Sequence, residues 1–437
     1  MVFGTALSGI QASTKELDVI GHNIANASTT GFKSSRAEFA DVYSSGALGS
    51  GALSIGSGVR LSNVQQSFGQ GHMSFTNNAL DLGVSGNGFF VLSDNGSRIY
   101  SRAGAFTVSH DGFIENAAHL KLQGLAADAA GNIGSSLGDI KISKENILPR
   151  ATTSVTTGLN LDANSKVVTA NWDGGPTPGV TTYNNLSTTT VFDSLGNSHV
   201  LSTYFIKADS TAALGTPNAS SPPGTNNQWY VAFQLDGQNV PANVATDNTD
   251  NLVRVNFNAD GSFNNAMDVT NTLLPANLIP ISKTMTNGAE NLNISVDLTS
   301  ISQFGTHFAV QSTTQDGYTT GQLSGLEVSA EGVILGSYTN GRTKAMGQVQ
   351  LANFANNNGL IPQGDTTWSE SANSGQAIVG NAGDGGLGYF ESGSLEDSNV
   401  DLTAELVKLI SAQRNFQANA QTIKTADSIT QTIINIR

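Results

Sequence analysis

The two ends of the chain carry a helical pattern, which limits the possible folds more than any other sequence feature. Near the N-terminus, apolar or small residues recur at alternating spacings of four and three, which places them on one helix face. They are Phe3, Leu7, Ile10, Thr14, Leu17, Gly21 and Ile24. We therefore predict an amphipathic helix within residues 1–32.

A second and longer helix is predicted within residues 399–437. Ser398 and Asp401 can form a capping box at its start. Two rows of residues then repeat every seven positions, namely Leu402, Leu409, Phe416, Ile423 and Thr430 beside Leu406, Gln413, Ala420, Asp427 and Ile434. A helix of about 35 residues spans about 52 Å.

Both helical stripes contain positions that weaken them. Thr14, Gly21, Gln413 and Asp427 stand where a self-sufficient coiled coil places Leu or Ile. Neither helix should therefore be stable alone. Two interpretations remain open: the helices dock on their own domain, or they pair with each other and with neighbouring subunits.

The chain between the ends is typical of β-structure. Short apolar runs are separated by dipeptides that favour tight turns, and 48 residues are Gly. These dipeptides are Asn95-Gly96, Asp111-Gly112, Asp236-Gly237, Asp260-Gly261, Asp316-Gly317 and Glu331-Gly332. Their spacing has no fixed period, which disfavours a repeat solenoid. We predict a mainly β multidomain fold with long α-helical termini that pair as coiled-coil-like segments.

Residues 151–317 differ in composition from the segments on either side. They hold four basic and twelve acidic residues, a net charge of −8, and they are rich in Thr and Asn. We interpret them as an outer β domain inserted into another β domain. The expected boundaries are 1–32 and 399–437 for the helices, 33–70 and 386–398 for linkers, and 71–150 and 318–385 for the two parts of the interrupted domain. The Gly/Ser-rich segments 44–58 and 380–388 are predicted to be flexible connectors.

Composition excludes several classes of function. A net charge of −14 argues against a nucleic-acid partner, and the chain has no apolar run long enough to insert into a membrane. The absence of Cys excludes thiolate chemistry, and the six His lack paired-ligand spacing. We find no positioned nucleophile, general base or cofactor cradle, so we expect no enzyme activity, catalytic residue, cofactor or metal. The first residues lack the basic and apolar regions of a signal peptide.

The segment HNIANASTTGFKSSRAEF, residues 22–39, resembles the opening of bacterial flagellar rod and hook proteins. The matching motif includes Asn23, Asn26, Thr30, Gly31, Phe32 and Lys33, while Ser28 replaces the Asn of many members. Locally, Gly31 suits the positive φ that ends a helix. The last 45 or so residues resemble the closing segment of the same family, and GLEVSAEGVILGSYTNGRTKAMGQVQLANFANNNGLIPQG resembles its second-half β domain.

The resemblance implies a structural subunit of the flagellar hook, because rod members are typically shorter and lack a large insertion. Such a subunit self-assembles into a curved, flexible tube that transmits motor torque to the filament. The implied partners are other copies of the chain, the flagellar rod, hook cap and hook–filament junction proteins, and the flagellar type III export apparatus. The implied location is extracellular. The expected polymer-core residues are Leu7, Ile10, Leu17, Ile24, Leu402, Leu406, Leu409, Phe416, Ile423 and Ile434.

Three alternatives remain. The chain could be another flagellar axial part, either a distal rod or a hook–filament junction protein. More remotely, it could be a secreted polysaccharide-active β protein. The segment FADVY, residues 39–43, resembles an aromatic export signal but equally suits a linker strand.

Overall fold

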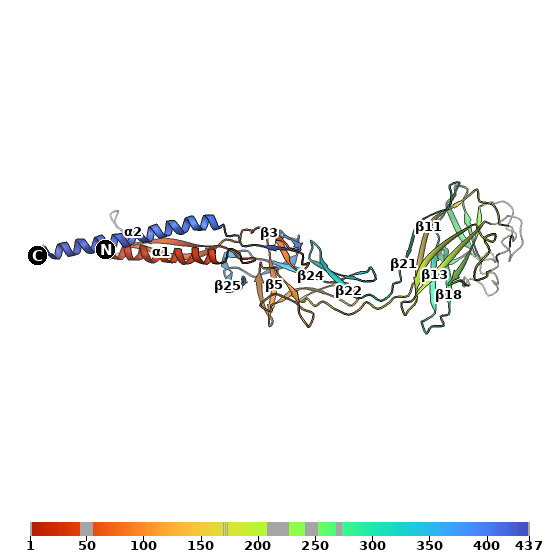
Figure 1. Cartoon of the computed structure of the whole chain (residues 1–437), viewed down its shortest axis with the longest axis horizontal. Coiled ribbons are helices and arrows are strands. Elements are labelled where there is room, and N and C mark those ends of the chain that lie inside the picture. Colours follow the sequence, from red (N-terminus) through yellow and green to blue (C-terminus); the bar gives the residue numbers. More distant parts are fainter. Residues whose placement is uncertain are drawn as a thin grey trace. The chain divides into compact units, whose positions relative to one another are not determined.

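A computed structural model describes residues 2–43, 56–168, 170, 172, 174–207, 227–240, 252–267 and 273–435. The chain divides into two compact units, drawn in sequence colours in Figure 1. Unit 1 contains Met1–Lys144, Leu323–Ser337 and Arg342–Arg437, and unit 2 contains Glu145–Gln322 and Tyr338–Gly341. Strands dominate both units, and a helix lies at each end of the chain, which confirms the predicted mainly β, nested fold class.

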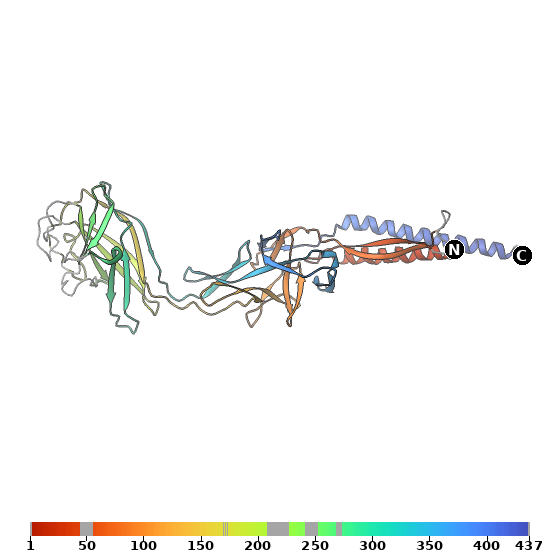
Figure 2. The same cartoon turned by 180° about the vertical axis from the view of Figure 1, so that it is seen from behind.

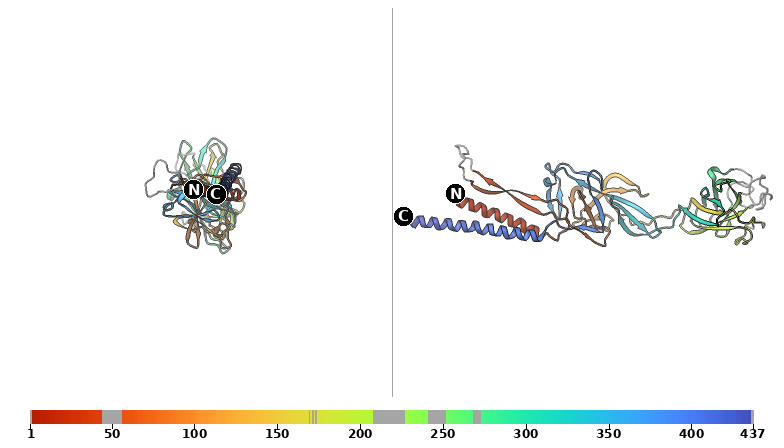
Figure 3. Two further views of the ribbon diagram at one scale, coloured as in Figure 1. Left: turned by 90° about the vertical axis from the view of Figure 1, so that its left-hand side faces the viewer. Right: turned by 90° about the horizontal axis from the view of Figure 1, so that it is seen from above.

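The helices α1 (Val2–Ala25) and α2 (Leu402–Asn435) lie side by side in unit 1 (Figures 1 and 3). They are antiparallel, because Gly9 lies against Asn419 and Phe3 lies beside Ala426. With 34 residues against 24, α2 extends past the N-terminal end of α1.

The start of α2 differs from the predicted capping box. Asp401 is the N-cap, and its Oδ1 accepts hydrogen bonds from the backbone N–H of Thr403 and Ala404, at 2.8 and 3.2 Å. Ser398 caps no helix, because its Oγ accepts a hydrogen bond from the Val400 N–H at 3.3 Å. The helix therefore begins one turn later than Ser398 would place it.

Strands from both ends of the chain interleave in the β part of unit 1, as the view from behind shows (Figure 2). The largest sheet has the order β22 (Leu323–Val328), β23 (Val333–Tyr338), β24 (Thr343–Asn353), β9 (Lys121–Ala127), β5 (Phe89–Asp94), β6 (Ser97–Ser101), β26 (Thr367–Ser369) and β25 (Ile361–Gly364). Attached to it are β7 (Thr107–Val108), β8 (Ile114–Glu115), β10 (Ile133–Asp139) and β27 (Ile378–Asn381). A 3-10 turn covers Asn357–Gly359. The late strand β24 pairs with β9 and β5, so the first half of this sheet is completed by the second.

Small two-stranded sheets occupy the segments predicted to be linkers. In residues 33–70, β1 (Ser35–Val42) pairs with β2 (Gly58–Gln66), and residues 44–55 of the predicted connector lie outside the described residues. In residues 386–398, β28 (Tyr389–Ser392) pairs with β4 (Leu82–Ser85), and β29 (Ser394–Glu396) pairs with β3 (Met73–Phe75). These segments are therefore parts of the fold.

The segment 380–388, predicted to be a flexible connector, is a packed turn. Leu387 is buried, and the Gly388 N–H donates to the Asn87 carbonyl at 2.7 Å. Its glycines allow a backbone conformation that other residues rarely adopt, because Gly383, Gly385 and Gly386 have φ values of 86°, 58° and 87°.

The described residues of unit 2 form two sheets. One has the order β18 (Leu278–Lys283), β19 (Leu292–Asp297), β11 (Ser154–Asp162) and β20 (Ser302–Phe304), with β21 (Ala309–Gln315) also paired to β11. The other has the order β12 (Asn185–Phe192), β13 (Ser198–Lys207), β14 (Gln228–Leu235), β16 (Leu252–Phe257) and β17 (Phe263–Met267), with β15 (Gln238–Asn239) paired to β14. A 3-10 turn covers Pro275–Asn277.

One hydrophobic core joins the two sheets of unit 2. Alternate residues of β14, Trp229, Val231 and Phe233, share this core with Leu159 of β11 and Ile294 of β19. The opposite face of β14 packs on a second cluster around Trp172 and Tyr204. The two-residue period of a strand explains both contacts.

Five of the six predicted turn dipeptides lie in tight turns that connect the two strands of a hairpin. At Asn95-Gly96, between β5 and β6, both residues have positive φ, 49° and 97°. Asp316-Gly317 is the exception, because it follows β21 and joins no hairpin. The Asp316 carboxylate instead accepts hydrogen bonds from the N–H groups of Thr153 and Ser154, at 2.8 and 2.9 Å, and holds the two chain segments at the base of unit 2 together.

His199 gives unit 2 a predicted pH dependence. Burial lowers the pKa of His199, but hydrogen bonds to Asp236 (2.6 Å) and Asp193 (3.4 Å) outweigh burial and leave this pKa raised. The stabilisation is complete below the unfolded pKa of about 6.5 and is lost as the pH rises through the folded value. We expect the free energy of unfolding of unit 2 to fall between pH 5.5 and 8.5, measured by urea denaturation, and to fall less in His199→Gln. An equal fall in the parent chain and in His199→Gln would contradict this assignment.

Candidate functional site

The end of α1 is fixed to unit 1 by side chains of the motif that follows it. Asn23 is buried, its Nδ2 donates to the Ser35 carbonyl at 2.7 Å, and its Oδ1 accepts from the Ser35 N–H at 2.9 Å. Phe32 turns back onto the helix and meets the His22 ring edge-on, with centroids 5.4 Å apart. The turn between them requires Gly31, whose φ is 69°.

Gly31 is also in a place that has no room for a side chain. A Cβ at this position would lie 2.5 Å from the backbone nitrogen of Ala103. The Gly31 N–H donates to the Glu396 carbonyl at 2.7 Å, so this residue joins the N-terminal motif to the segment that leads into α2.

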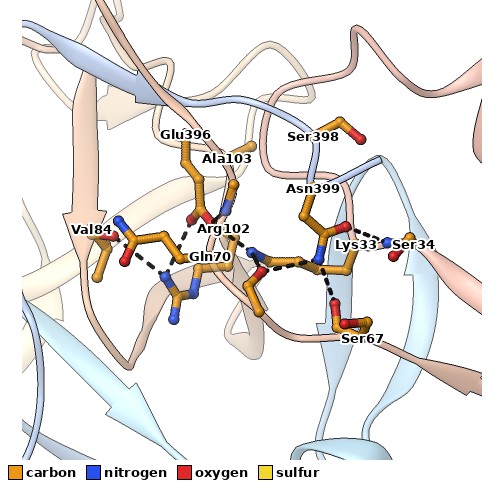
Figure 4. Close-up of polar contacts among 12 residues, drawn as sticks. Lys33, Ser34, Ser67, Gln70, Val84, Arg102, Ala103, Glu396, Ser398 and Asn399 are labelled. Carbon is orange, nitrogen blue, oxygen red and sulfur yellow. Dashed lines mark hydrogen bonds and ion pairs between the residues drawn. The ribbon is translucent and has the colours of Figure 1, made fainter. Parts of the chain in front are cut away.

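The next motif residue, Lys33, belongs to a buried ion cluster (Figure 4). The Lys33 Nζ lies 2.6 Å from Glu396 Oε1, and both side chains are 0% exposed. The Arg102 guanidinium lies 3.2 Å from the other carboxylate oxygen, Oε2. We call Lys33, Arg102 and Glu396 the anchor cluster.

The anchor cluster holds two cations and one anion away from water. Burial lowers the pKa of the Lys33 ammonium, Glu396 opposes this effect, and the nearby charge of Arg102 lowers the pKa further. Burial also lowers the pKa of Arg102, again against the attraction of Glu396. The Glu396 carboxylate therefore opposes the effect of burial on both cations.

Main-chain groups add hydrogen bonds to the cluster. Lys33 Nζ donates to the Gly69 carbonyl at 2.9 Å, and the Gly71 N–H donates to Glu396 Oε1 at 2.8 Å. Asn399 adds a second tie, because its Oδ1 accepts from the Ser34 N–H at 2.7 Å (Figure 4). Both terminal helices are thus connected to unit 1 through one polar junction.

Above this junction, α2 packs on α1 through a row that differs partly from the predicted one. The most buried positions of α2 are Glu405, Leu409, Ala412, Asn419, Ala420, Ile423 and Ala426, and Phe416 is 37% exposed. Leu409, Ala420 and Ile423 belong to the predicted rows, but Leu406, Gln413 and Asp427 of the second row are exposed and the residue before each of them is buried instead. Ala412 and Ala426 occupy the interface because small side chains allow the two helices to approach closely.

The remaining predicted polymer-core residues fall into two groups. Ile10, Leu17 and Ile24 of α1 are half-buried. Leu7, Leu402, Leu406 and Ile434 are exposed, with exposed fractions of 52%, 48%, 50% and 67%. Leu402, Leu406 and Ile410 recur every four residues and form a row on α2 that no described residue covers. We call this the α2 apolar row.

Sequence reasoning missed Arg102, Glu396 and Asn399. The structure buries Glu396 six residues before α2 begins. The only local signal was the motif residue Lys33, a cation between a buried Phe and a strand, which needed a counter-ion somewhere in the chain.

Two features are absent from the described residues. No group of three or more His, Asp or Glu side chains there is arranged to hold a metal ion. In the same part of the chain, neither helix is both long and apolar enough to cross a membrane.

Comparisons with known proteins give one consistent result. The flagellar hook protein FlgE of Escherichia coli is 38% identical over the whole of both chains, and that of Salmonella typhimurium is 35% identical, also over the whole of both. The chain belongs to the flagellar hook protein FlgE family. FlgE of Borreliella burgdorferi is 33% identical over 99% of this chain and 98% of the relative.

Four family models match successive parts of the chain. They are "Flagella basal body rod protein" at residues 3–33, "Flagellar hook protein FlgE/F/G D1 domain" at 83–174, "Flagellar basal body protein FlaE D2 domain" at 160–318 and "Flagellar basal body rod FlgEFG protein C-terminal" at 391–436. The first and last matches each contain one partner of the Lys33–Glu396 ion pair. The anchor cluster therefore joins the two terminal regions that the wider rod and hook family shares.

A solved structure supports the fold. The crystal structure of Helicobacter pylori flagellar hook protein FlgE2 matches with a TM-score of 0.51 over 74% of this chain and 100% of that chain. Its sequence identity is 13%, so the likeness concerns the fold alone.

Replacing Gly31 tests the junction between α1 and unit 1. We expect Gly31→Ala to lower the free energy of unfolding of unit 1 by about 2 kcal/mol or more, because Ala is strained at positive φ and its Cβ meets the Ala103 backbone. Denaturation followed by the fluorescence of Trp368, the Trp of unit 1, measures the change. Gly21→Ala is the matched control, because no atom lies within 4 Å of its Cβ and Ala favours the helix interior. Equal effects of the two substitutions would contradict the assignment.

Proposed function

We propose that the chain polymerises through its two helices into the tube of the flagellar hook and transmits torque while that tube bends. The family assigns the chain to the structural hook proteins. The mechanism of assembly is our inference from the helix surfaces.

The observation that carries the proposal is the apolar surface left open on the helix pair. In addition to the α2 apolar row, α1 exposes Phe3 and Leu7, at 45% and 52%, towards the other end of the helix pair. Rigid apolar rows of this kind mark contact surfaces with other chains. Neighbouring copies supply the simplest partner, because a polymer subunit must present complementary surfaces to itself.

The two compact units suit different mechanical tasks. The α1–α2 pair is held to unit 1 by the anchor cluster, which supports a role for the helices as the stiff inner part of the tube. Unit 2 carries most of the acidic excess of the chain and has its own core. We propose that contacts between outer units are hydrated and slide as the tube bends.

The proposal also includes the partners of the chain and its export from the cell. The rod, the hook cap, the hook–filament junction proteins and the type III export apparatus are the expected partners, and the expected location is outside the cell without a cleaved signal peptide. The export signal proposed at residues 39–43 falls on the end of β1 and the residue after it.

Replacing Leu406 tests the assembly surface without disturbing the subunit. We expect Leu406→Asp to abolish polymer formation, because a contact between copies would bury its carboxylate without a partner. The free energy of unfolding should change by less than about 0.5 kcal/mol, because Leu406 is half exposed. Sedimentation and electron microscopy measure assembly. Leu409→Asp and Phe416→Asp should also block it, but these face α1 and should weaken the helix pair as well.

The matched control is Ser411→Asp, which adds the same charge to an exposed position on another side of α2. Normal tubes are expected from this variant. Normal tubes from Leu406→Asp would show that the α2 apolar row is not the assembly surface.

The location is tested on isolated flagellar basal bodies with a gold-labelled antibody against residues 151–317. Gold along the curved segment between rod and filament is the expected result. Gold confined to the straight rod or to the junction with the filament would assign the chain to that part instead.

A further inference from the structure

The segments that lead into and out of unit 2 pair with each other at its base. Two residue pairs exchange backbone hydrogen bonds there, and they are Ile147 with Gly321 and Arg150 with Tyr318. Beyond these pairs, β11 and β21 continue the antiparallel pairing, and β11 enters the hydrophobic core of unit 2. We call residues 146–153 and 316–322 the two halves of the stem.

The stem is too closely packed to be a loose linker. A Cβ at Gly317 would lie 2.7 Å from the backbone nitrogen of Thr152, and a Cβ at Gly321 would lie 2.6 Å from the side-chain Cγ of Asn340. Asn340 also belongs to unit 2, and its Nδ2 donates to the Thr319 carbonyl at 2.8 Å. Glycine at positions 317 and 321 therefore permits close contact in the stem and does not add freedom to it.

Asp316 joins the two halves of the stem at the point where they meet β11. Its Oδ1 accepts hydrogen bonds from the N–H groups of Thr153 and Ser154, at 2.8 and 2.9 Å. Its Oδ2 accepts hydrogen bonds from the Thr153 hydroxyl at 2.6 Å and from the Arg150 guanidinium at 3.1 Å. Burial raises the pKa of Asp316, but these hydrogen bonds and the charge of Arg150 outweigh burial and leave the pKa lowered. The carboxylate is therefore charged at neutral pH, which strengthens its hydrogen bonds.

The antiparallel geometry of the stem determines how the stem bears a load. Two antiparallel strands that are pulled apart at one end open one hydrogen-bonded pair at a time, which needs little force. Strands that are pulled along their length must break several hydrogen bonds together, which needs more force. A load that acts unequally on the two halves opens the stem by the first route. Asp316 lies between the last backbone pair of the stem and the sheet, so it is the contact that stops this opening.

We propose that Asp316 is a mechanical latch: it holds the two halves of the stem together, so that a pull on either half passes along β11 into the core of unit 2. The latch is a property of unit 2 alone. The identity of the load as motor torque, unlike the latch itself, rests on the proposed function.

Native-state hydrogen exchange of the unassembled full chain measures the latch at rest. We expect Asp316→Ala to raise exchange at the N–H groups of Ile147, Arg150, Tyr318 and Gly321 by at least about tenfold, because it removes hydrogen bonds to a charged group. None of these four N–H groups bonds to Asp316, so their faster exchange reports opening of the whole stem. Asp316→Asn should have a smaller effect, because its Oδ1 can still accept two N–H groups.

Two outcomes of the exchange experiment would overturn the proposal. Faster exchange at Thr153 and Ser154 alone would show that Asp316 makes only a local contact. An equal rise in β13 and β14 would show that Asp316 supports the folding of the whole unit and does not hold the stem. The expected result is unchanged exchange in these two strands, which also shows that unit 2 of the variant remains folded.

Optical tweezers measure the latch under load. The chain has no Cys, so Asn146→Cys and Gln322→Cys supply two unique attachment points at the open end of the stem. We expect Asp316→Ala to raise the rate at which the stem opens at constant force by at least about tenfold. An unchanged rate would overturn the proposal.

The matched control is Asp260→Ala. Asp260 precedes a Gly in unit 2 as Asp316 does, but its Oδ1 accepts hydrogen bonds within its own turn, from the N–H and hydroxyl of Ser262 at 2.9 and 2.6 Å. Exchange in the stem and the opening rate should stay within about twofold of the parent chain. The unassembled chain is used throughout, so failure of the proposed polymer contact leaves these results unaffected.

Discussion

The structure depends on the burial of two cations against one carboxylate. Lys33 and Arg102 lose their hydration when the N-terminal motif closes, and Glu396 is the group that compensates both. Because Glu396 lies just before α2, the same interaction fixes the start of one terminal helix and the end of the other. Gly31 and Asn399 add hydrogen bonds at the same junction. The helix pair is thus a rigid extension of unit 1, with an orientation set at its base.

That orientation determines which helix surface remains for other chains. α1 and α2 meet through small and half-buried side chains, including Gly9 and Ala412, so much of their apolar surface is left over. A helix pair designed only to stabilise its own subunit would bury Leu402 and Leu406. Their exposure on a rigid support is the expected feature of a subunit whose core is completed by its neighbours. Membership of a structural hook family agrees with this arrangement.

Unit 2 is stabilised by a hydrophobic core of its own. Its core is formed between its own two sheets, and the Asp316 carboxylate ties the entering and leaving segments together through Thr153 and Ser154. The unit can therefore remain folded whatever state the junction of unit 1 is in. This independence suits a part that meets its neighbours through hydrated and adjustable contacts.

The sequence by itself determined the terminal helices, the β character of the middle and the family, because helix periodicity, turn dipeptides and motifs are local. It also predicted the positive φ of Gly31, which lies in the turns that follow α1. It could not supply the ion partner of Lys33, because the choice of Glu396 over its neighbour Asp397 depends on which strand edge faces the motif. The same limit explains the row on α2: heptad spacing identified Leu409, but close packing selected Ala412 in place of Gln413. The segment 380–388 was interpreted as a flexible connector, and only the tertiary structure showed that its glycines supply turn geometry. Contacts between residues hundreds of positions apart are decided by the fold, because a local sequence pattern indicates the conformation of a residue but not its tertiary contacts.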